Sequence, residues 1–383
     1  MDYGFATRCI YGNGRDFDRD QTGAISFPIY QTATYAHPEV GCSTGFDYSR
    51  LQNPTRQQVE KIVASLEGGT DALAFSSGMA AITAMMELFA PGDHLITDMD
   101  LYGGSIRLFQ NVSRKNGILF SHIDCSTEDA EAYIQENTKA IFIETPTNPM
   151  MHVVDIRKAA GIAKKHGLLL IVDNTFMSPY FQNPLALGAD IVIHSGTKFL
   201  GGHNDTLAGF IVTGSEEISD RLRFLIKTVG SGLSPFDSWL IIRGIKTLPL
   251  RMEKAQENAK AVAEYLLNEP KVKKVYYPGI PGSRGYEVCK KQAGGFGSML
   301  TFEVESSRLA HHILKSTKLI PFAESLGGTE TLLTYPVTQT HADVPEEVRI
   351  KNGITDRVLR LSAGIEDKND LIADLKQAIG TFE

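Results

Sequence analysis

The stretch IVIHSGTKFLGGHND (residues 191–205) carries the clearest sign of the fold class. It begins as a continuous apolar, β-branched run, which is typical of a strand buried on both faces of a parallel sheet. It ends in glycines, and between the two parts Lys198 follows the small hydroxyl residues Ser195 and Thr197. A lysine at the end of a buried strand, beside hydroxyls suited to phosphate, indicates a ligand site rather than a solvent-exposed loop.

Strand and helix patterns alternate on the N-terminal side of this stretch. Short apolar runs predict strands at 71–75, 93–98, 139–144, 168–174 and 190–195, and helical spacing predicts helices at 54–69, 76–90 and 155–167. Such alternation predicts an α/β domain with a mostly parallel sheet. We assign it to residues 56–245.

The sequence changes character on both sides of this domain. Residues 1–55 are polar and rich in turn formers, so we expect an N-terminal arm rather than a separate domain. Near residue 246 a long amphipathic helix (246–268) begins. It is followed by strand patterns at 271–279, 297–304 and 358–366 and helix patterns at 307–316 and 367–382. Residues 246–383 therefore form a predicted smaller α+β domain.

Composition narrows the class of protein. The chain has 383 residues, 42% of them hydrophobic, and a net charge of −7, which gives no overall attraction to nucleic acid or an anionic membrane. The apolar stretch 72–90 is interrupted by polar residues and does not predict a membrane span. The four cysteines form no C-x-x-C pair, and the first residues lack the apolar core of a secretory signal. We expect a cytoplasmic protein without a metal site.

Polar residues follow several of the predicted strands. Asp173 ends one strand, Asn148 follows a second, and Lys198 follows a third. Ligands bind beyond the carboxyl ends of parallel strands, so these side chains are expected in one crevice. Gly78 and Met79 begin a helix after another strand, and the N–H groups at a helix N-terminus suit a phosphate.

These residue types together describe one cofactor. A desolvated lysine amine such as that of Lys198 forms a Schiff base with an aldehyde. The buried Asp173 carboxylate needs a cationic partner, and a protonated pyridine nitrogen is one. An aldehyde, a phosphate and a basic ring nitrogen are found together in pyridoxal 5′-phosphate (PLP). Tyr102 is a candidate to stack on its ring, and Arg360 to bind a substrate carboxylate.

Each of these residues, taken alone, also has an ordinary structural explanation. A lysine at a strand end can extend to solvent, and an aspartate there can cap a turn. A tyrosine can belong to the core, and an arginine to the surface. Only their combination favours the cofactor.

The sequence around these residues resembles the Cys/Met-metabolism family of PLP-dependent enzymes. This family includes cystathionine γ-synthase, cystathionine γ-lyase, cystathionine β-lyase, methionine γ-lyase and the homoserine-ester sulfhydrylases. The resemblance covers nearly the whole chain. Its matching stretches are YSRLQNPTR (48–56), AFSSGMAAI (74–82), DLYGGS (100–105), ETPTNP (144–149), IVDNTF (171–176), HSGTKFLGGHND (194–205), SPFDSWLIIRGIKTLPLRM (234–252), ESLGGTET (324–331) and RLSAGIE (360–366).

The resemblance implies a fold and a role for each candidate residue. The fold is fold type I, aspartate-aminotransferase-like, with a mostly parallel seven-stranded sheet and a smaller C-terminal domain. Lys198 would carry the cofactor and move protons, Asp173 would pair with the ring nitrogen, and Tyr102 would stack on the ring and act as a base. The remaining roles are phosphate binding by Gly78, Met79, Ser195 and Thr197, and binding of the substrate carboxylate or a ring oxygen by Asn148, Ser325 and Arg360.

The resemblance also implies an assembly. Tyr48 and Arg50 in the arm would reach the phosphate site of a neighbouring subunit. The expected state is a homodimer with shared active sites, paired into a homotetramer.

The resemblance leaves the particular reaction open. Methionine γ-lyases carry a cysteine in the turn where this chain has YGG (102–104), which argues against that activity. Glu324 is shared by γ-synthases and γ-lyases, where it meets the distal amino group of cystathionine. YGGS and RLF look like γ-synthases, whereas THAD (340–343) resembles γ-lyases. We expect γ-elimination or γ-replacement on cystathionine or an O-acyl-L-homoserine, with β-lyase, sulfhydrylase and methionine γ-lyase activities as alternatives.

Two other classes of protein fit the sequence less well. A nicotinamide-dependent oxidoreductase needs G-x-G-x-x-G after its first strand, and the nearest text, GNGRDF (12–17), lies in the predicted arm. A non-catalytic binding protein would not need Lys198 and Asp173 together.

Overall fold

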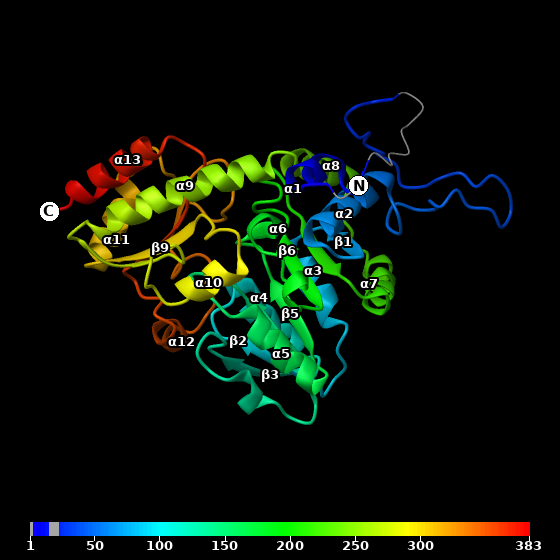
Figure 1. The fold of residues 1–383 in the computed structure, drawn as a ribbon, viewed down its shortest axis with the longest axis horizontal. Helices are drawn as coiled ribbons and strands as arrows, with labels where there is room; N and C mark the ends of the chain where they lie inside the picture. The colour runs from blue at the N-terminus through cyan, green and yellow to red at the C-terminus, as the bar shows by residue number, and fades with distance from the viewer. Residues whose placement is uncertain (1–2, 15–22) are drawn as a thin grey trace.

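The computed structural model describes residues 3–14 and 23–383. Parts of two predicted segments, GNGRDF (12–17) and the arm (1–55), lie outside the described residues. The structure contains two sheets and confirms the predicted class, a large α/β unit with a smaller α+β unit beside it, at the left in Figure 1.

The larger sheet has seven strands and is mostly parallel. In spatial order they are β1 (Asp71–Phe75), β7 (Gly209–Thr213), β6 (Ile191–Ser195), β5 (Leu169–Asp173), β4 (Thr138–Glu144), β2 (His94–Asp98) and β3 (Leu119–Ile123). β7 runs antiparallel to both of its neighbours, and the other pairs are parallel. The carboxyl ends of β4, β5 and β6 therefore lie side by side, as the sequence predicted.

Helices cover both faces of this sheet. One face packs against α2 (Pro54–Glu67), α5 (Ile156–His166), α6 (Ser178–Phe181), α8 (Pro235–Ile245) and the first turns of α9 (Leu248–Leu267). The other face packs against α3 (Gly78–Met86), α4 (Gly103–Leu108) and α7 (Glu216–Val229). The helix predicted over 76–90 is shorter than expected, because a turn follows Met86 before Pro91.

Local sequence explains where the helices begin and end. In α2, the Asn53 side chain accepts hydrogen bonds from the backbone N–H of Thr55 at 3.0 Å and of Arg56 at 3.3 Å, and Pro54 occupies the first turn. Gly68 ends the helix in the left-handed conformation, with φ of 74°. α2 therefore ends at Glu67, a residue that is fully buried beneath the sheet.

The smaller sheet has four antiparallel strands. They are β10 (Leu332–Thr334), β11 (Val358–Ser362), β9 (Met299–Val304) and β8 (Val272–Tyr276). Its core is shared with the second half of α9 and with α11 (Ser307–Ser316) and α13 (Lys368–Gly380). Short helices α10 (Tyr286–Gln292) and α12 (Glu346–Lys351) lie in its connections.

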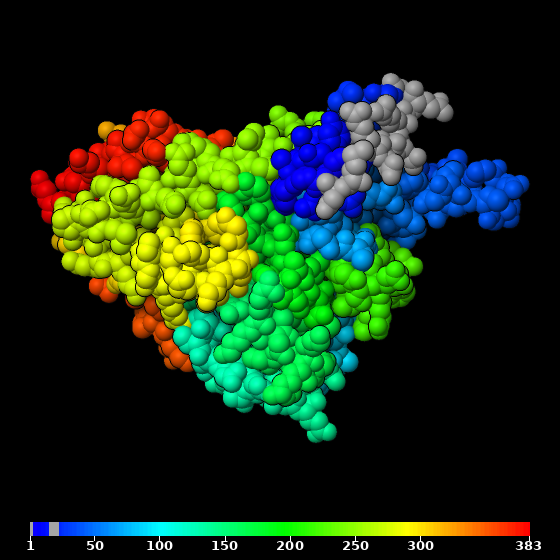
Figure 2. Space-filling model, viewed as in Figure 1, coloured from blue at the N-terminus to red at the C-terminus, as the bar shows by residue number. Residues whose placement is uncertain are grey.

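The described part of the N-terminal segment is divided in two. Helix α1 (Phe5–Tyr11) packs on α2 and buries Cys9 in the large core. The stretch after residue 23 projects away from the body as an extended loop (Figures 1 and 2). At its far end Val40 is fully exposed. Within residues 3–14 and 23–383, none of the helices is both long and apolar enough to cross a membrane.

Candidate active site

A cavity of about 200 Å³ lies where β4, β5 and β6 end. It is bounded on the other side by residues of the small domain. Eleven of the predicted site residues line it: Gly78, Met79, Tyr102, Asn148, Asp173, Ser195, Thr197, Lys198, Glu324, Ser325 and Arg360. The structure thus gathers residues from seven separate stretches of sequence around one space.

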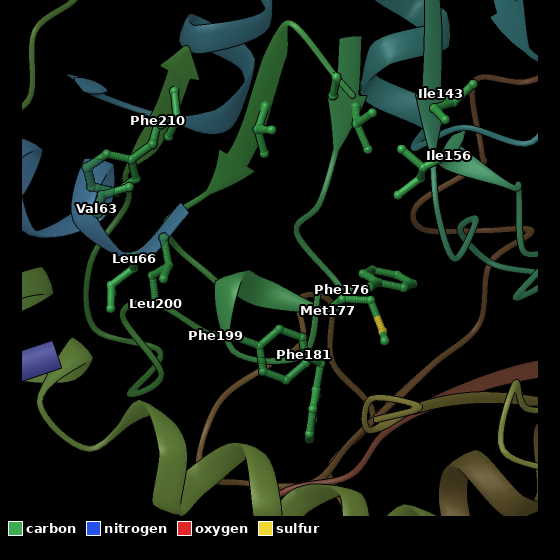
Figure 3. Packing of buried hydrophobic residues seen from close by; sticks show 14 of the residues in the cluster. Val63, Leu66, Ile143, Ile156, Phe176, Met177, Phe181, Phe199, Leu200 and Phe210 are labelled. Carbon is green, nitrogen blue, oxygen red and sulfur yellow. The ribbon is translucent and has the colours of Figure 1, made fainter. Parts of the chain in front are cut away.

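Lys198 is held in this cavity from both sides. Its amine donates a hydrogen bond to the Ser325 hydroxyl at 2.8 Å. The next two residues, Phe199 and Leu200, are buried in the large core beside Leu66 and Phe181 (Figure 3). Burial lowers the pKa of the Lys198 amine to about 8, and the positive charge of Arg360 acts in the same direction. More of this amine is therefore uncharged and nucleophilic near neutral pH than of an ordinary lysine amine.

Asp173 ends β5 beneath the cavity and is only 8% exposed. One carboxylate oxygen accepts hydrogen bonds from the backbone N–H of Thr175 at 3.0 Å and from its hydroxyl at 2.6 Å. Burial raises the pKa of the Asp173 carboxyl, while the Thr175 hydrogen bonds and the charge of His194 lower it. Among the described residues no lysine or arginine forms an ion pair with Asp173, so a cationic ring nitrogen fits this position.

The N-terminus of α3 forms one wall of the cavity. The Ser77 hydroxyl caps the helix by accepting a hydrogen bond from the N–H of Ala80 at 3.0 Å. The other N–H groups of the first turn have no partners within the helix. A Cβ on Gly209 would lie 2.1 Å from the Ser77 carbonyl oxygen, and one on Gly78 would lie 3.1 Å from the Ser195 Cβ. Glycine at both positions lets β7 and Ser195 approach the helix end, which suits a phosphate.

Arg360 reaches the cavity from β11 of the small domain and is 1% exposed. Its guanidinium donates to the Asn148 side-chain oxygen at 2.9 Å and to the Ser325 carbonyl at 2.8 Å. The Nε–H is buried and has no hydrogen-bond partner among residues 3–14 and 23–383. Burial lowers the pKa of Arg360 to about 10, and within the described parts of the chain no carboxylate forms an ion pair with it. This cation is therefore available for a substrate carboxylate.

Tyr102 lies at the mouth of the cavity and is 38% exposed. Its backbone N–H donates to a Glu144 carboxylate oxygen at 2.8 Å. A Cβ on Gly103 would lie 2.0 Å from the Thr340 carbonyl oxygen, and one on Gly104 would lie 2.5 Å from the Tyr102 ring. The YGG turn thus needs its glycines, because any side chain there would displace Tyr102 or the loop at Thr340.

Two predicted residues lie outside this cavity. The Arg50 guanidinium donates to the Lys227 carbonyl at the end of α7 and lies 5.5 Å from the centre of the Tyr48 ring. Tyr48 is 43% exposed. Neither residue contributes to the cavity of its own chain, and their predicted role in a neighbouring subunit stays a prediction.

Some residues around the site were not among the predicted site residues. Thr175 bonds to Asp173, and its hydroxyl also accepts from the Ser195 N–H at 2.9 Å. Its position two residues after a strand-ending aspartate was the available signal, because hydroxyl residues there commonly bond to such a carboxylate. Glu144 and Thr340 line the cavity as well. Thr340 belongs to THAD (340–343), which resembled γ-lyases in the sequence, but that motif did not indicate that Thr340 would reach the cavity from a distant loop.

Asp100 lies in the loop that leads to Tyr102, and its ionisation should make the stability of the protein depend on pH. Burial raises the pKa of its carboxyl to about 7. The unfolded chain loses this proton near pH 4, so the free energy of unfolding should fall as pH rises from about 4 to 7. Asparagine at position 100 cannot ionise, so the Asp100→Asn variant should not lose stability over this pH range. Its free energy of unfolding relative to the parent should be about 2 kcal/mol larger at pH 8 than at pH 5.

Denaturant unfolding at the two pH values measures this difference. The exposed Asp220→Asn serves as the control and should leave the pH dependence unchanged. An Asp100→Asn variant with the same pH dependence as the parent would show that Asp100 is already ionised at pH 5.

The fold and the cavity together define a PLP-dependent enzyme of fold type I. The chain belongs to the Cys/Met metabolism PLP-dependent enzyme family, whose family model matches residues 6–380. The predicted resemblance and the predicted cofactor are therefore confirmed. The chain is an enzyme of this family rather than a nicotinamide-dependent oxidoreductase or a non-catalytic binding protein.

Individual relatives cover almost the whole chain. It is 51% identical over 369 residues to a cystathionine γ-synthase/O-acetylhomoserine (thiol)-lyase of Bacillus subtilis (strain 168), covering 96% of this chain and 94% of the relative. It is 47% identical over 374 residues to a cystathionine β-lyase of Lactococcus lactis subsp. cremoris (strain MG1363), covering 97% and 98%. The crystal structure of cystathionine γ-lyase from Lactobacillus plantarum complexed with L-serine superposes with a TM-score of 0.96 at 42% identity, covering 99% of both chains.

Proposed function

We propose that this protein catalyses γ-elimination or γ-replacement on cystathionine or an O-acyl-L-homoserine. One observation carries the proposal: Lys198, Arg360 and Glu324 line a single cavity. Arg360 offers a buried cation for the α-carboxylate of the substrate. Glu324 offers an anion for a second, distal ammonium group, which cystathionine has and homoserine esters lack.

Each residue of the cavity has a separate role in this reaction. PLP, when bound, supplies an electron sink for the carbanion at the substrate Cα. Asp173 would pair with the ring nitrogen, Tyr102 would cover the ring, and the N-terminus of α3 with Ser195 and Thr197 would hold the phosphate. Lys198 Nζ would hold the cofactor and then move protons at Cα and the neighbouring carbon. Asn148 and the Ser325 backbone orient the Arg360 guanidinium toward the carboxylate.

Two alternative activities are a methionine γ-lyase and a β-lyase. A methionine γ-lyase would carry a cysteine in the YGG turn, where this chain has Gly103 and Gly104. A Cβ on Gly103 would lie 2.0 Å from the Thr340 carbonyl oxygen, and one on Gly104 would lie 2.5 Å from the Tyr102 ring. These close contacts support the expectation against that activity. The cavity does not exclude a β-lyase, and a relative of that name is 47% identical to this chain over 374 residues, so products must separate β- from γ-elimination.

The test is a spectrum followed by product analysis. The purified protein with PLP should absorb at about 420 nm. Cystathionine should then give cysteine, 2-oxobutanoate and ammonia by γ-elimination, whereas β-elimination would give homocysteine, pyruvate and ammonia. O-Acyl-L-homoserines with cysteine or sulfide should give the γ-replacement products. Pyruvate and homocysteine as the sole products would overturn the proposed reaction in favour of a β-lyase.

The assembly and location belong to the same proposal. We place residues 1–55 in an arm, 56–245 in the PLP-binding domain and 246–383 in the small domain. We infer a homodimer that shares its active sites and pairs into a tetramer, in the cytoplasm. The projecting loop after residue 23 and the exposed Tyr48 support an arm that contacts another subunit (Figure 2).

The shared site predicts complementation between two inactive variants. Arg50→Ala should lose phosphate binding in the neighbouring site, and Lys198→Ala should lose the catalytic amine of its own site. After the two variants are refolded together, a mixed dimer has one site with both defects and one with neither. Its activity should return to at most about half of the parent value, because two-fold symmetry gives two sites per dimer.

Size analysis with differently tagged chains must show that the subunits exchanged. The same mixing with two copies of Lys198→Ala is the control and should stay inactive. A mixture of exchanged Arg50→Ala and Lys198→Ala chains that stays equally inactive would mean that Arg50 acts within its own chain.

A further inference from the structure

A buried acid–histidine pair lies on the side of the large sheet opposite the cavity lining. Glu67 ends α2 and His194 is the penultimate residue of β6, and their side chains are 0% and 1% exposed. The His194 Nε2 and a Glu67 carboxylate oxygen are 2.6 Å apart. Neither residue lines the cavity described above.

Hydrogen bonds connect this pair to the strand ends that carry the site. The oxygen of Glu67 that meets His194 also accepts from the Asn174 side chain at 3.0 Å. Asn174 directly follows Asp173, and its backbone N–H donates to the Ile193 carbonyl at 2.9 Å. Glu67 therefore ties the residue after Asp173 to the residue before Ser195.

The buried carboxylate of Glu67 needs a positively charged partner. A fully buried carboxylate is costly unless a positive group pairs with it. Within residues 3–14 and 23–383, His194 is the basic side chain in ion-pair distance of Glu67. The other groups that donate to Glu67, Asn174 and Asn183, are neutral amides.

Asp173 faces the same requirement with a different set of neighbours. The Glu144 carboxyl lies next to Asp173 in the register of β4 and β5, and burial together with the charge of Asp173 raises the pKa of Glu144 well above its usual range. Thr175 supplies two neutral hydrogen bonds. The positive charge of His194 acts in the opposite direction from burial and lowers the pKa of Asp173.

We propose that Glu67 and His194 are positioning residues for the cofactor. Glu67 holds His194 as an imidazolium behind the ends of β5 and β6, and this charge keeps Asp173 ionised for the pyridine nitrogen. The inference rests on the proposed role of Asp173. It adds two residues that touch neither cofactor nor substrate and act through Asp173 alone.

The test compares binding of two cofactors to the apoprotein. PLP has the ring nitrogen, and its 1-deaza analogue has a C–H group there but keeps the aldehyde and the phosphate. The parent protein should prefer PLP, and Asp173→Asn should lose that preference. His194→Gln should reduce the preference by about tenfold, which corresponds to one pKa unit on Asp173, while the affinity for the deaza analogue should stay within about twofold.

A second buried histidine of the same sheet is the matched control. His94 on β2 is 1% exposed and bonds to two neutral hydroxyls, Thr138 at 2.8 Å and Ser121 at 2.9 Å. His94→Gln should leave the preference for PLP at the parent value. If His194→Gln fails to fold, Glu67→Gln replaces it, because it removes the charge and keeps the size of the side chain.

The possible results distinguish the role of Glu67 and His194 from the role of Asp173. A folded His194→Gln or Glu67→Gln that keeps the parent preference, or that loses affinity for both cofactors equally, overturns the role of the pair and leaves Asp173 in place. A parent protein without any preference for PLP, or an Asp173→Asn variant that retains it, overturns the assignment of Asp173 and this inference together.

Discussion

Replacing Lys198 with alanine should abolish turnover and leave the fold intact. The amine is the group that holds the cofactor and moves protons, and loss of a positioned proton-transfer group costs on the order of 10³-fold or more. The hydrogen bond that it gives up, to the Ser325 hydroxyl, is a single one. The residues that fasten this turn to the core, Phe199 and Leu200, are unchanged.

Steady-state kinetics and circular dichroism measure the two parts of this prediction. Lys254→Ala is the control, because Lys254 makes an exposed ion pair with Glu257 and such pairs contribute little. Borohydride reduction of the parent protein with PLP, followed by peptide mapping, should place the pyridoxyl label on Lys198. A label on another lysine would contradict the assignment.

Replacing Asp173 with asparagine should have the next largest effect on catalysis. The amide oxygen can still accept from Thr175, so the local hydrogen bonds are retained. The charge that stabilises a protonated ring nitrogen is lost, and removal of such preorganised charge raises the barrier by about 3 kcal/mol, or roughly 10²-fold in kcat. PLP affinity should also fall.

A carboxylate at the opposite edge of the same sheet provides the control. Asp190 precedes β6 and accepts from the Leu170 N–H at 2.7 Å. Asp190→Asn should change kcat by less than about twofold, because its charge lies far from the carboxyl ends of the strands. A near-normal kcat for Asp173→Asn would reduce Asp173 to a cap of the turn at Thr175.

Patterns in the sequence were sufficient for most of the large domain. The strands that follow residue 70 are short apolar runs, and they become buried strands in the structure. β3 and β7 were not predicted. β3 is an edge strand that includes the exposed Leu119 and polar Ser121, so it lacks the continuous apolar run of the central strands. β7 is an apolar, fully buried strand, and its pattern was not recognised in the sequence.

The strand-end residues could be predicted for a simple reason. Parallel strands place their carboxyl ends at one edge, so Asp173, Asn148 and Lys198 share a crevice whatever the details of packing. Of two small-domain residues in the site, Arg360 was a candidate because its guanidinium suits a carboxylate, and Ser325 was assigned by family resemblance alone. Nothing in the local pattern around either residue indicates which part of the large domain it meets.

The sequence by itself therefore determined the order of strands and helices and the residue types that end the strands, because hydrophobic periodicity and capping act over a few residues. Only the tertiary structure brought Lys198 to Ser325 across 127 residues and Arg360 to Asn148 across 212. The tertiary structure also set the pKa of Lys198. The pKa of Lys198 falls to about 8 because distant segments exclude water around its amine, and desolvation depends on the whole packed molecule rather than on neighbours in the chain.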